Sequence, residues 1–302
     1  MTTLTIYILC HNRPDDAREA IRSVLAQTDQ NFQLIVSDNS SNDEVQHMVQ
    51  REFPQIGYVR RVPMAPALTH FNLCIAETQD DYFCLFHDDD LMASEFVGQF
   101  RECARRFPQA VAIGCNAQIE RMGQLEGKHS FLSYGSCEVI ADARRLALRY
   151  FGRSQSGIAP FPGYVYNRRR MGDVLIPIEG GKYADVTWLL TQARRGPVVW
   201  INQPLMTYRL HASNDSNTES RRDRLRFLGY LKQNLATLGK GVLADYRCSF
   251  VYKRIRNEAQ PGHPERLRLA TRFLKHYRWA RYTRADTYTA VFKRALTKWM
   301  TR

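Results

Sequence analysis

Within residues 4–113, short runs of apolar and β-branched residues alternate with stretches in which apolar residues recur at helical spacing. The predicted strands are residues 4–9, 32–36, 58–59, 82–86 and 111–113, and the predicted helices are residues 14–25, 44–53, 67–78 and 94–107. Strands separated by helices of this length pair in parallel, with helices on both faces of the sheet. The order of elements therefore predicts an α/β fold with a mostly parallel central sheet.

Polar residues follow three of these strands at the point where each strand ends. The three segments are residues 11–13, 37–40 and 88–90. In a parallel sheet the carboxyl ends of the strands lie at one edge, where α/β proteins bind their ligands. A single polar end would carry little information, because loops are generally polar. Three of them together predict one ligand site at that edge.

The third segment consists of three adjacent carboxylates, Asp88, Asp89 and Asp90, which follow the apolar run Tyr82–Phe86 and His87. Three like charges repel one another, and solvent relieves that repulsion only in part at the end of a strand. A divalent cation is therefore their natural partner. The alternative is an ordinary polar turn in which an Asp caps the next helix.

Beyond residue 120 the pattern is less regular. Gly123, Gly127 and Gly135 predict a loop or a short hairpin, and from residue 222 on Lys and Arg alternate with Leu, Phe, Tyr and Trp, which predicts helices. The other predicted elements are a helix over 138–151, a strand over 164–166, a helix over 186–195 and a strand over 198–201.

The composition is that of a globular protein. The chain has 302 residues, of which 44% are hydrophobic, and this length allows a full core. It contains no stretch of about 18 uncharged apolar residues and no signal-type segment, so we expect a cytoplasmic protein. The seven cysteines form no C-x-x-C pair, which favours buried reduced thiols over disulfides or zinc ligands.

The net charge of +13 is unevenly distributed along the chain. Residues 222–302 contain 20 Lys and Arg against 5 Asp and Glu, whereas residues 1–221 are nearly neutral. We therefore expect two parts: a near-neutral body over 1–221, which the family resemblance given below implies to be a catalytic domain, and a basic, mainly helical extension over 222–302. Such an extension is suited to an anionic membrane surface. The alternative is a helical appendage that packs on the catalytic domain or on a second copy.

The N-terminal half resembles family 2 glycosyltransferases, which have the GT-A fold. The matching segments are Ile6–Pro14, Ala20–Thr28 and Leu34–Asp43, and Asp88–Asp90 lies where that family has its metal-binding D-x-D-type motif. The resemblance covers roughly residues 4–218. The family often has an N-x-G stretch after the third strand, but this chain has Pro63–Asn72 there, so the loop above the nucleotide pocket differs.

The resemblance implies roles for the residues at the strand ends. Asp38 would accept a hydrogen bond from the nucleobase, Asp89 would bind the ribose, and Asn12 and Asn72 would belong to the nucleotide pocket. The alternative for Asp38 is to cap the turn that follows it. Residues expected to bind Mg²⁺ or Mn²⁺ are Asp90, together with Asp88 and His211. His211 is equally compatible with a structural role.

Asp185 lies where the family has its catalytic carboxylate, at the start of a helix and after Gly180 and Gly181. The family motif is often Glu-Asp, but here Ala184 precedes Asp185, so this position offers a single base. The alternative is a helix N-cap. One base on the face opposite the diphosphate implies an inverting transfer.

The resemblance implies a metal-dependent hexosyl- or N-acetylhexosaminyltransferase. Its donor would be a nucleotide-diphosphate sugar, most simply a UDP-sugar. Its acceptor would be a glycan or lipid-linked glycan in cell-surface polysaccharide synthesis, and the enzyme would be attached peripherally to the inner face of the membrane. Two rival functions are nucleic-acid binding through the basic tail and nucleotidyl transfer. Residues 1–221 carry no nucleic-acid-binding motif, and His11–Pro14 is not the Gly-rich loop typical of nucleotidyltransferases. No nucleic-acid partner is therefore expected.

Overall fold

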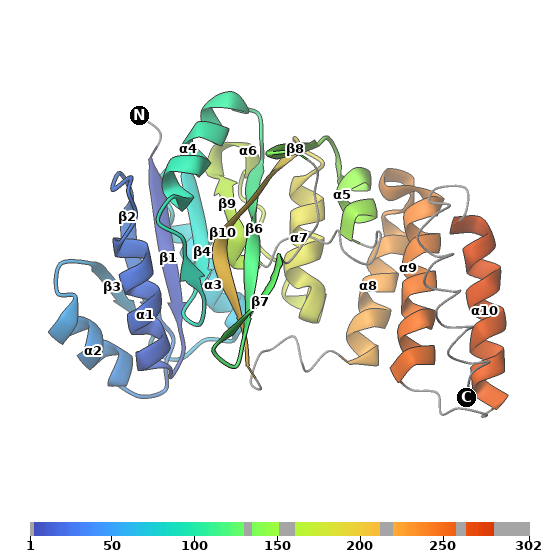
Figure 1. The fold of residues 1–302 in the computed structure, drawn as a ribbon, viewed down its shortest axis with the longest axis horizontal. Coiled ribbons are helices and arrows are strands. Elements are labelled where there is room, and N and C mark those ends of the chain that lie inside the picture. The colour runs from blue at the N-terminus through green and yellow to red at the C-terminus, as the bar shows by residue number, and fades with distance from the viewer. Residues whose placement is uncertain (1–2, 130–134, 151–160, 212–219, 258–263, 281–302) are drawn as a thin grey trace. The chain divides into compact units, whose positions relative to one another are not determined.

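The structure, a computed structural model, describes residues 3–129, 135–150, 161–211, 220–257 and 264–280 (Figure 1). By their internal contacts these residues form two units. We call the first unit, which contains all the strands, the catalytic unit. The second, the helical unit, contains α5 (Ala143–Tyr150), α8 (Arg221–Gln233), α9 (Leu235–Asn257) and α10 (Pro264–Ala280).

The N-terminal half of the catalytic unit comprises β1 (Leu4–Cys10), α1 (Pro14–Leu25), β2 (Gln33–Asp38), α2 (Glu44–Glu52), β3 (Gly57–Arg60), α3 (Ala67–Glu77), β4 (Tyr82–His87), β5 (Leu91–Met92) and α4 (Phe96–Arg106). Its remaining elements are β6 (Ala112–Arg121), β7 (Gln124–His129), β8 (Cys137–Ile140), β9 (Tyr164–Asn167), α6 (Arg168–Met171), α7 (Ala184–Gln192), β10 (Val198–Leu210) and the short 3-10 segments Phe161–Gly163 and Ile178–Tyr183.

The strands form one sheet in the order β3-β2-β1-β4-β9-β6-β10-β5, with β7 beside β6 and β8 beside β10. The four strands β3, β2, β1 and β4 are parallel to their neighbours, as the sequence predicts. β9 pairs antiparallel with both β4 and β6, and β6 and β10 are again parallel. The α/β fold is confirmed, and the sheet is mixed beyond β4.

Two predictions for the second half of the catalytic unit need correction. The predicted helix over 138–151 is wrong in its first part, because Cys137–Ile140 is a strand that pairs antiparallel with β10, and the helix begins at Ala143. The fifth and last predicted strands are longer than expected, since β6 and β10 pair with each other as far as Arg121 and Leu210. The predicted hairpin is present as β6 and β7, with positive φ at Met122 and Gly123 in its turn.

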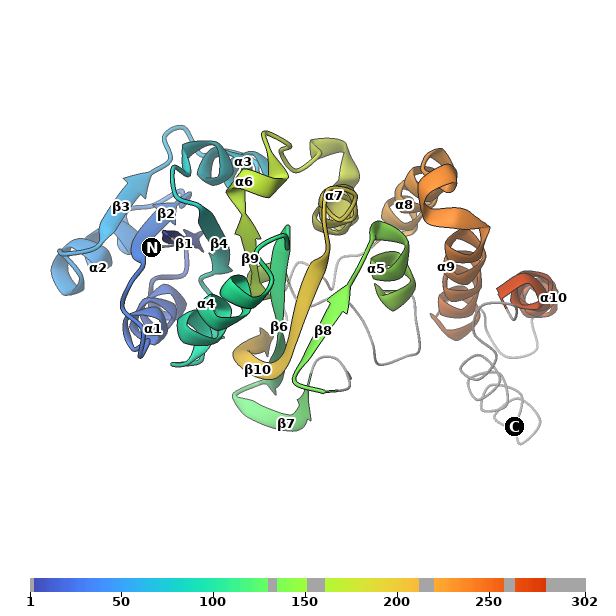
Figure 2. The same cartoon turned by 90° about the horizontal axis from the view of Figure 1, so that it is seen from above.

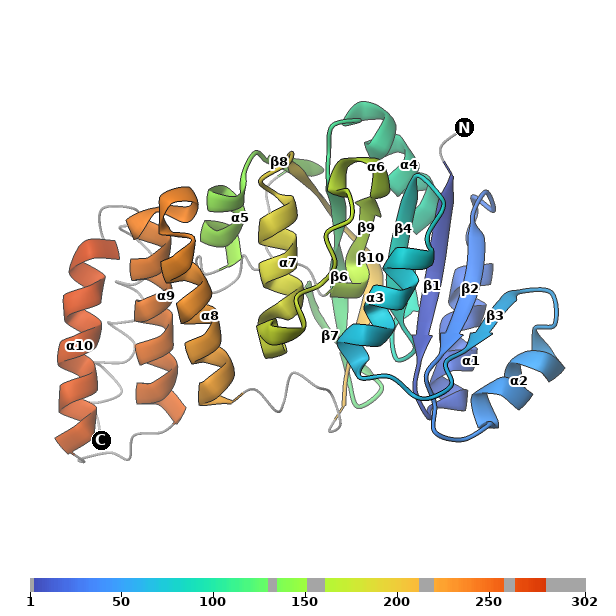
Figure 3. The same ribbon diagram turned by 180° about the vertical axis from the view of Figure 1, so that it is seen from behind.

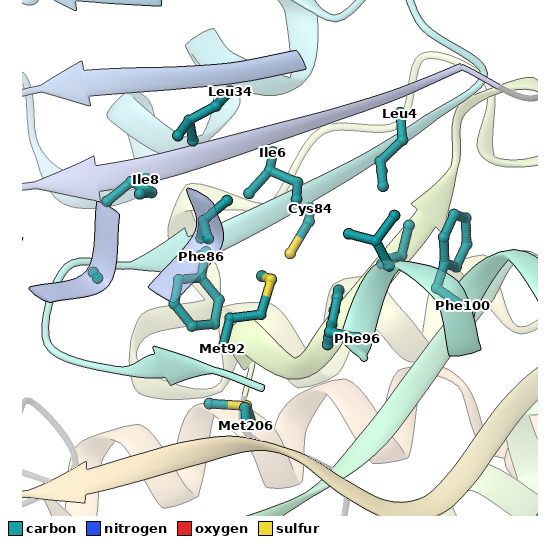
Figure 4. Close-up of a cluster of buried hydrophobic side chains, with 14 of the residues drawn as sticks. Leu4, Ile6, Ile8, Leu34, Cys84, Phe86, Met92, Phe96, Phe100 and Met206 are labelled. Atoms are coloured by element: carbon teal, nitrogen blue, oxygen red, sulfur yellow. The ribbon is translucent and has the colours of Figure 1, made fainter. Parts of the chain in front are cut away.

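Strand side chains alternate between the two faces of the sheet, as a period of two requires. Leu4, Ile6 and Ile8 of β1 belong to the main core, and so do buried residues of α1, α2 and α4 (Figure 4). α1 and α4 lie on one face of the sheet, and α3 and α7 lie on the other (Figures 2 and 3). Because each fully buried aliphatic side chain contributes about 1.5–3 kcal/mol, this core fixes the strand ends that carry the site.

The opposite face of the sheet is rich in aromatic residues. Phe83 of β4, Tyr166 of β9 and Trp188 of α7 are fully or almost fully buried. The ring of Tyr166 lies 4.7 Å from that of Trp188 and 5.3 Å from that of Phe83, measured between centroids. This packing holds α7 against the middle of the sheet.

The helical unit has its own core. α9 packs against α5, α8 and α10. Phe227 of α8 lies 5.1 Å from Tyr246 of α9 and 6.4 Å from Tyr150 of α5, between ring centroids. Ser220 and Asp223 form a capping box that begins α8. The unit thus includes α5 in addition to the predicted helices after residue 222.

All seven cysteines are free thiols, and six of them are buried, as predicted. In the part of the chain that the structure describes, no helix combines the length and the apolar character needed to span a membrane.

Candidate active site

The carboxyl ends of β1, β2 and β4 meet at one edge of the sheet, as predicted. The backbone N–H of His11 donates to Asp88 Oδ2 at 2.9 Å, and that of Asn12 donates to Ser40 Oγ at 2.8 Å. His11 Nδ1 lies 2.9 Å from the carbonyl oxygen of Asn39. These contacts join the three polar segments into one surface.

Asn12 shapes the loop after β1. Its φ of 55° lies in the left-handed region, which asparagine tolerates better than most residues. Its side chain accepts a hydrogen bond from the N–H of Ser41 at 2.9 Å and donates to Ser41 Oγ at 3.0 Å. Asn12 therefore ties the loop after β1 to the loop after β2.

Asp38 is fully buried at the end of β2. Its Oδ1 accepts from the N–H of Ser40 at 2.9 Å, which is the turn-capping contact considered as its alternative role. Its Oδ2 accepts from Tyr58 Oη at 2.7 Å and from Arg60 Nη1 at 2.6 Å. Asp38 thus fixes two side chains of β3 beside the site.

Asp88 contacts the loop after β1. Its Oδ2 accepts from His11, and its Oδ1 pairs with Arg13 Nη2 at 2.5 Å. Burial raises the pKa of Asp88 to about 7 in spite of the positive charge of Arg13. The side chain therefore points toward β1, and it positions Arg13.

Asp89 lies between the side chains of Arg13 and His211. Its Oδ2 pairs with Arg13 Nη1 at 2.6 Å and lies 2.9 Å from His211 Nε2. Burial alone would raise the pKa of Asp89, but His87, Arg13 and His211 outweigh it, so the pKa lies below its usual value. Asp89 is therefore an ionised carboxylate at neutral pH.

Asp90 is fully buried. Its Oδ1 accepts from the backbone N–H of Arg209 at 3.0 Å, whereas its Oδ2 is buried with no hydrogen-bond partner among the residues that the structure describes. Burial, and then the charge of Asp89, raises the pKa of Asp90 well above its usual value. A carboxylate in this environment is stabilised by a cation.

His87, Asp89 and Asp90 form a group whose ligand atoms lie within 4.8 Å of one another. Two oxygen ligands and an imidazole suit a divalent ion, and the buried Oδ2 of Asp90 fits such an ion as well. The predicted metal set was Asp88, Asp90 and His211. Of these only Asp90 belongs to the group, while His211 contacts its member Asp89 and Asp88 pairs with Arg13, which also contacts Asp89.

His87 was missed by the sequence interpretation, although it directly precedes the acid run. The available signal was its place as the last residue of β4, next to the carboxylates. Asp89, predicted to bind ribose, belongs to this group, and its contact with the ribose stays a prediction.

Asn72 lies on α3 and contacts a loop far along the chain. Its Nδ2 donates to the carbonyl oxygen of Ile176 at 2.9 Å, and its Oδ1 accepts from the N–H of Ile176 at 2.8 Å. Both polar groups of the side chain are thus used by one residue of the loop that leads into α7. In this structure Asn72 positions that loop.

Asp185 lies in the first turn of α7 and is partly exposed. Trp188 Nε1 donates to the carbonyl oxygen of Val174 at 2.8 Å, which ties α7 to the same preceding loop. Burial, followed by the charges of Tyr164 and Asp185, raises the pKa of Tyr166 well above its usual value. Asp185 therefore lies on the helix that packs, through Trp188, against Tyr166 on the aromatic face of the sheet.

The predictions for the end of the chain lie outside the described residues. Phe292 and Trp299, proposed as apolar membrane contacts, fall beyond residue 280, and the side chain of Trp279 is also not described.

Comparison with known proteins identifies the family. The sequence model of glycosyl transferase family 2 matches residues 5–167, which is more than half of the chain. Uncharacterized glycosyltransferases of Rickettsia conorii and Rickettsia felis are each 32% identical over 98 residues. The match covers 32% of this chain and 16% of each relative.

Solved structures share the fold. A fragment of Staphylococcus aureus TarS, residues 1–349, aligns with a TM-score of 0.62 at 13% identity, over 93% of this chain and 81% of the fragment. The same fragment in complex with UDP-GlcNAc gives a TM-score of 0.62 at 11% identity, over 91% and 81% of the two chains. Identities this low show the fold alone. The family match extends from β1 through the acid run to β9, and this chain therefore belongs to glycosyl transferase family 2.

Proposed function

We propose that this protein transfers a sugar from a UDP-sugar to a hydroxyl group of a glycan or lipid-linked glycan. The observation that carries the proposal is the junction of the ends of β1, β2 and β4 around the buried acids Asp88–Asp90. The family membership and the TarS complexes with UDP-GlcNAc and UDP support a nucleotide-sugar donor. A hexose or an N-acetylhexosamine is the sugar class that we expect.

In this proposal Asp38 recognises the nucleobase together with the groups that it fixes. Its Oδ2 is already hydrogen-bonded to Tyr58 and Arg60, so these two side chains are presented with it to the base. Asn12 holds the loop that borders the nucleotide, and Asn72 acts at a distance through Ile176.

His87, Asp89 and Asp90 would hold Mg²⁺ or Mn²⁺, with His211 orienting Asp89 and Asp88 orienting Arg13. Such an ion offsets the negative charge that builds up on the departing diphosphate. Arg13 adds a positive charge at the same edge, on a side chain that is 34% exposed. Oδ2 of Asp90, which is buried and has no hydrogen-bond partner among the described residues, is available to such an ion.

Asp185 is proposed as the general base. Its carboxylate would take the proton of the acceptor hydroxyl while the hydroxyl oxygen attacks the anomeric carbon and UDP departs from the opposite side. Attack opposite the leaving group inverts the anomeric configuration. The loop held by Asn72 and Trp188 fixes the start of α7, and so the place of this base.

We further propose that residues 1–221 act as the catalytic domain and that residues 222–302 attach the enzyme peripherally to an anionic membrane during cell-surface polysaccharide synthesis. Support comes from the excess of 15 positive charges in residues 222–302. On α8, for example, Arg222, Arg226 and Lys232 are exposed. Attraction to anionic lipid amounts to about 1 kcal/mol per cation near the surface.

Isothermal titration calorimetry with UDP and UDP-GlcNAc, each with Mn²⁺ or with EDTA, tests the donor site. We expect binding that is strengthened by Mn²⁺ and is weakened in Asp90→Asn. Arg105→Gln, a change at an exposed cation on α4, is the control and should bind like the wild type. Equal affinity in EDTA and Mn²⁺ would contradict the metal part of the proposal, and absence of UDP binding would contradict the function.

A further inference from the structure

Two aromatic rings lie face to face beside the candidate metal group. Phe71 of α3 and Phe161, in the 3-10 segment before β9, have centroids 5.6 Å apart and an interplanar angle of 15°. The ring of His87 lies 5.9 Å from each of them. Both phenylalanines are partly exposed, whereas the neighbouring rings of Tyr166 and Trp188 are buried.

The same pair extends toward the candidate base. The ring of Phe161 lies 6.4 Å from that of Trp188, which is one helical turn after Asp185. Residues three apart lie on one face of a helix, so Asp185 and Trp188 face the same side of α7. Phe161 therefore lies between His87 and the helix that carries Asp185.

We propose that Phe71 and Phe161 form the surface against which the transferred sugar of the donor packs, and that they thereby set donor-sugar affinity. This inference rests on the proposed function. An aromatic ring offers a flat apolar face, and the C–H face of a pyranose is its natural complement. In a UDP-sugar the transferred sugar is joined directly to the diphosphate. Because His87 belongs to the group proposed to hold the metal ion of the diphosphate, rings that lie beside His87 also lie next to the transferred sugar.

Core packing alone would not account for the arrangement. The neighbouring rings of Tyr166 and Trp188 are almost completely buried and form the core on this face of the sheet. Phe71 and Phe161, by contrast, are partly exposed residues whose rings lie beside His87, the last residue of β4. A glycan acceptor is the competing occupant, and the test distinguishes it from the donor sugar.

The test compares the dissociation constants of UDP and UDP-sugars for the full-length protein with Mn²⁺. The probes are UDP, UDP-GlcNAc, UDP-glucose and UDP-galactose, and the variants are Phe161→Leu, Phe71→Leu and Phe161→Tyr. The measured quantity is the dissociation constant of the UDP-sugar that the wild type binds most tightly, divided by the dissociation constant of UDP. We expect both Leu variants to raise this ratio by about three- to tenfold. Phe161→Tyr keeps the ring and should restore the wild-type ratio.

Phe107→Leu is the matched control, because Phe107 is another partly exposed phenylalanine of the catalytic unit, at the end of α4. Unchanged UDP affinity in the Leu variants shows that the site remains folded. An unchanged ratio in both Leu variants would overturn the inference, as would a change confined to the KM of the acceptor. If the wild type binds no UDP, the proposed function itself fails, and this inference fails with it.

Discussion

Among the residues of the helical unit whose side chains the structure describes, the buried charged residues are two cations, Arg149 and Arg224, and two anions, Asp223 and Asp245. At the end of β4 the balance is different, because Asp88, Asp89 and Asp90 are consecutive, buried and all acidic. Arg13 pairs with two of these acids, whereas Asp90 receives a hydrogen bond from a backbone N–H. The described part of the helical unit therefore buries equal numbers of cations and anions, whereas the catalytic unit concentrates buried negative charge at one edge.

The difference separates structural from functional charge. A balanced buried set can specify packing, whereas uncompensated buried carboxylates destabilise the protein unless a cation is bound. The positive charges of the helical unit, by contrast, lie mostly on residues that face solvent, such as those of α8. Charge in the catalytic unit is therefore suited to a bound ion and diphosphate, and charge on the helical unit to a large anionic surface.

The largest expected effect is a pair of opposite changes in stability. Asp90→Asn should raise the free energy of unfolding in EDTA by about 3 kcal/mol, because it removes a buried carboxylate that lacks a compensating charge. Asp223→Ala in the helical unit should lower it by about 1 kcal/mol, because the carboxylate of Asp223 accepts hydrogen bonds from Ser220 in the capping box that begins α8. Urea denaturation monitored by circular dichroism measures both, and a change of the same sign in the two variants would break the comparison.

A pH effect of about 3 kcal/mol is expected from His70, a buried histidine of the catalytic unit. Burial, and then the charge of Arg61, lowers the pKa of His70 from 6.5 to about 4. His70 of the unfolded chain therefore takes up a proton below pH 6.5, whereas His70 of the folded chain does so only near pH 4. The contribution of neutral, buried His70 to the free energy of unfolding is thus present above pH 6.5 and is lost as the pH falls toward 4.

His70→Gln should flatten the stability profile between pH 6.5 and 4. Its matched control is His276→Gln in the helical unit, where burial also lowers the pKa but the side chain is partly exposed, so the change in slope should be smaller. Urea denaturation at several pH values supplies the measurement, and equal slopes for wild type and His70→Gln would refute the assignment.

Asp185→Asn should lower turnover by about 10²-fold, or about 2.7 kcal/mol, while leaving the affinity for UDP nearly unchanged. The reason is that a general base acts on the acceptor and does not hold the nucleotide. Turnover with a genuine acceptor and calorimetry with UDP give the two values, and NMR of the product should show an inverted anomeric configuration. Wild-type turnover in the variant would exclude Asp185 as the base.

The smallest effect concerns the exposed cations of the helical unit. Arg226→Gln on α8 should weaken binding to anionic vesicles by about fivefold at low salt, or about 1 kcal/mol, because one screened attraction is lost. Arg105→Gln, at an exposed cation of the catalytic unit, should have no such effect. Flotation with phosphatidylserine vesicles measures both. Equal binding of the full-length protein to neutral and anionic vesicles would show that charge is not responsible.

The sequence by itself determined the parallel half of the sheet and the location of its functional edge. The elements from β1 to α4 follow from hydrophobic periodicity, which is a local property of the chain, and parallel pairing then places residues 11–13, 37–40 and 88–90 together. Burial of the cysteine thiols could also be predicted, because most of them lie within apolar runs.

Only the tertiary structure decided the features that depend on pairing between distant segments. β8 becomes a strand because it pairs with β10, and β9 makes the sheet mixed by inserting between β4 and β6. Asn72 contacts Ile176, which is 104 residues away, and His87 joins Asp89 and Asp90 because of the way the chain turns after β4. Local periodicity specifies which face of an element is buried, but the partner of a polar side chain depends on which segments the whole fold brings to it.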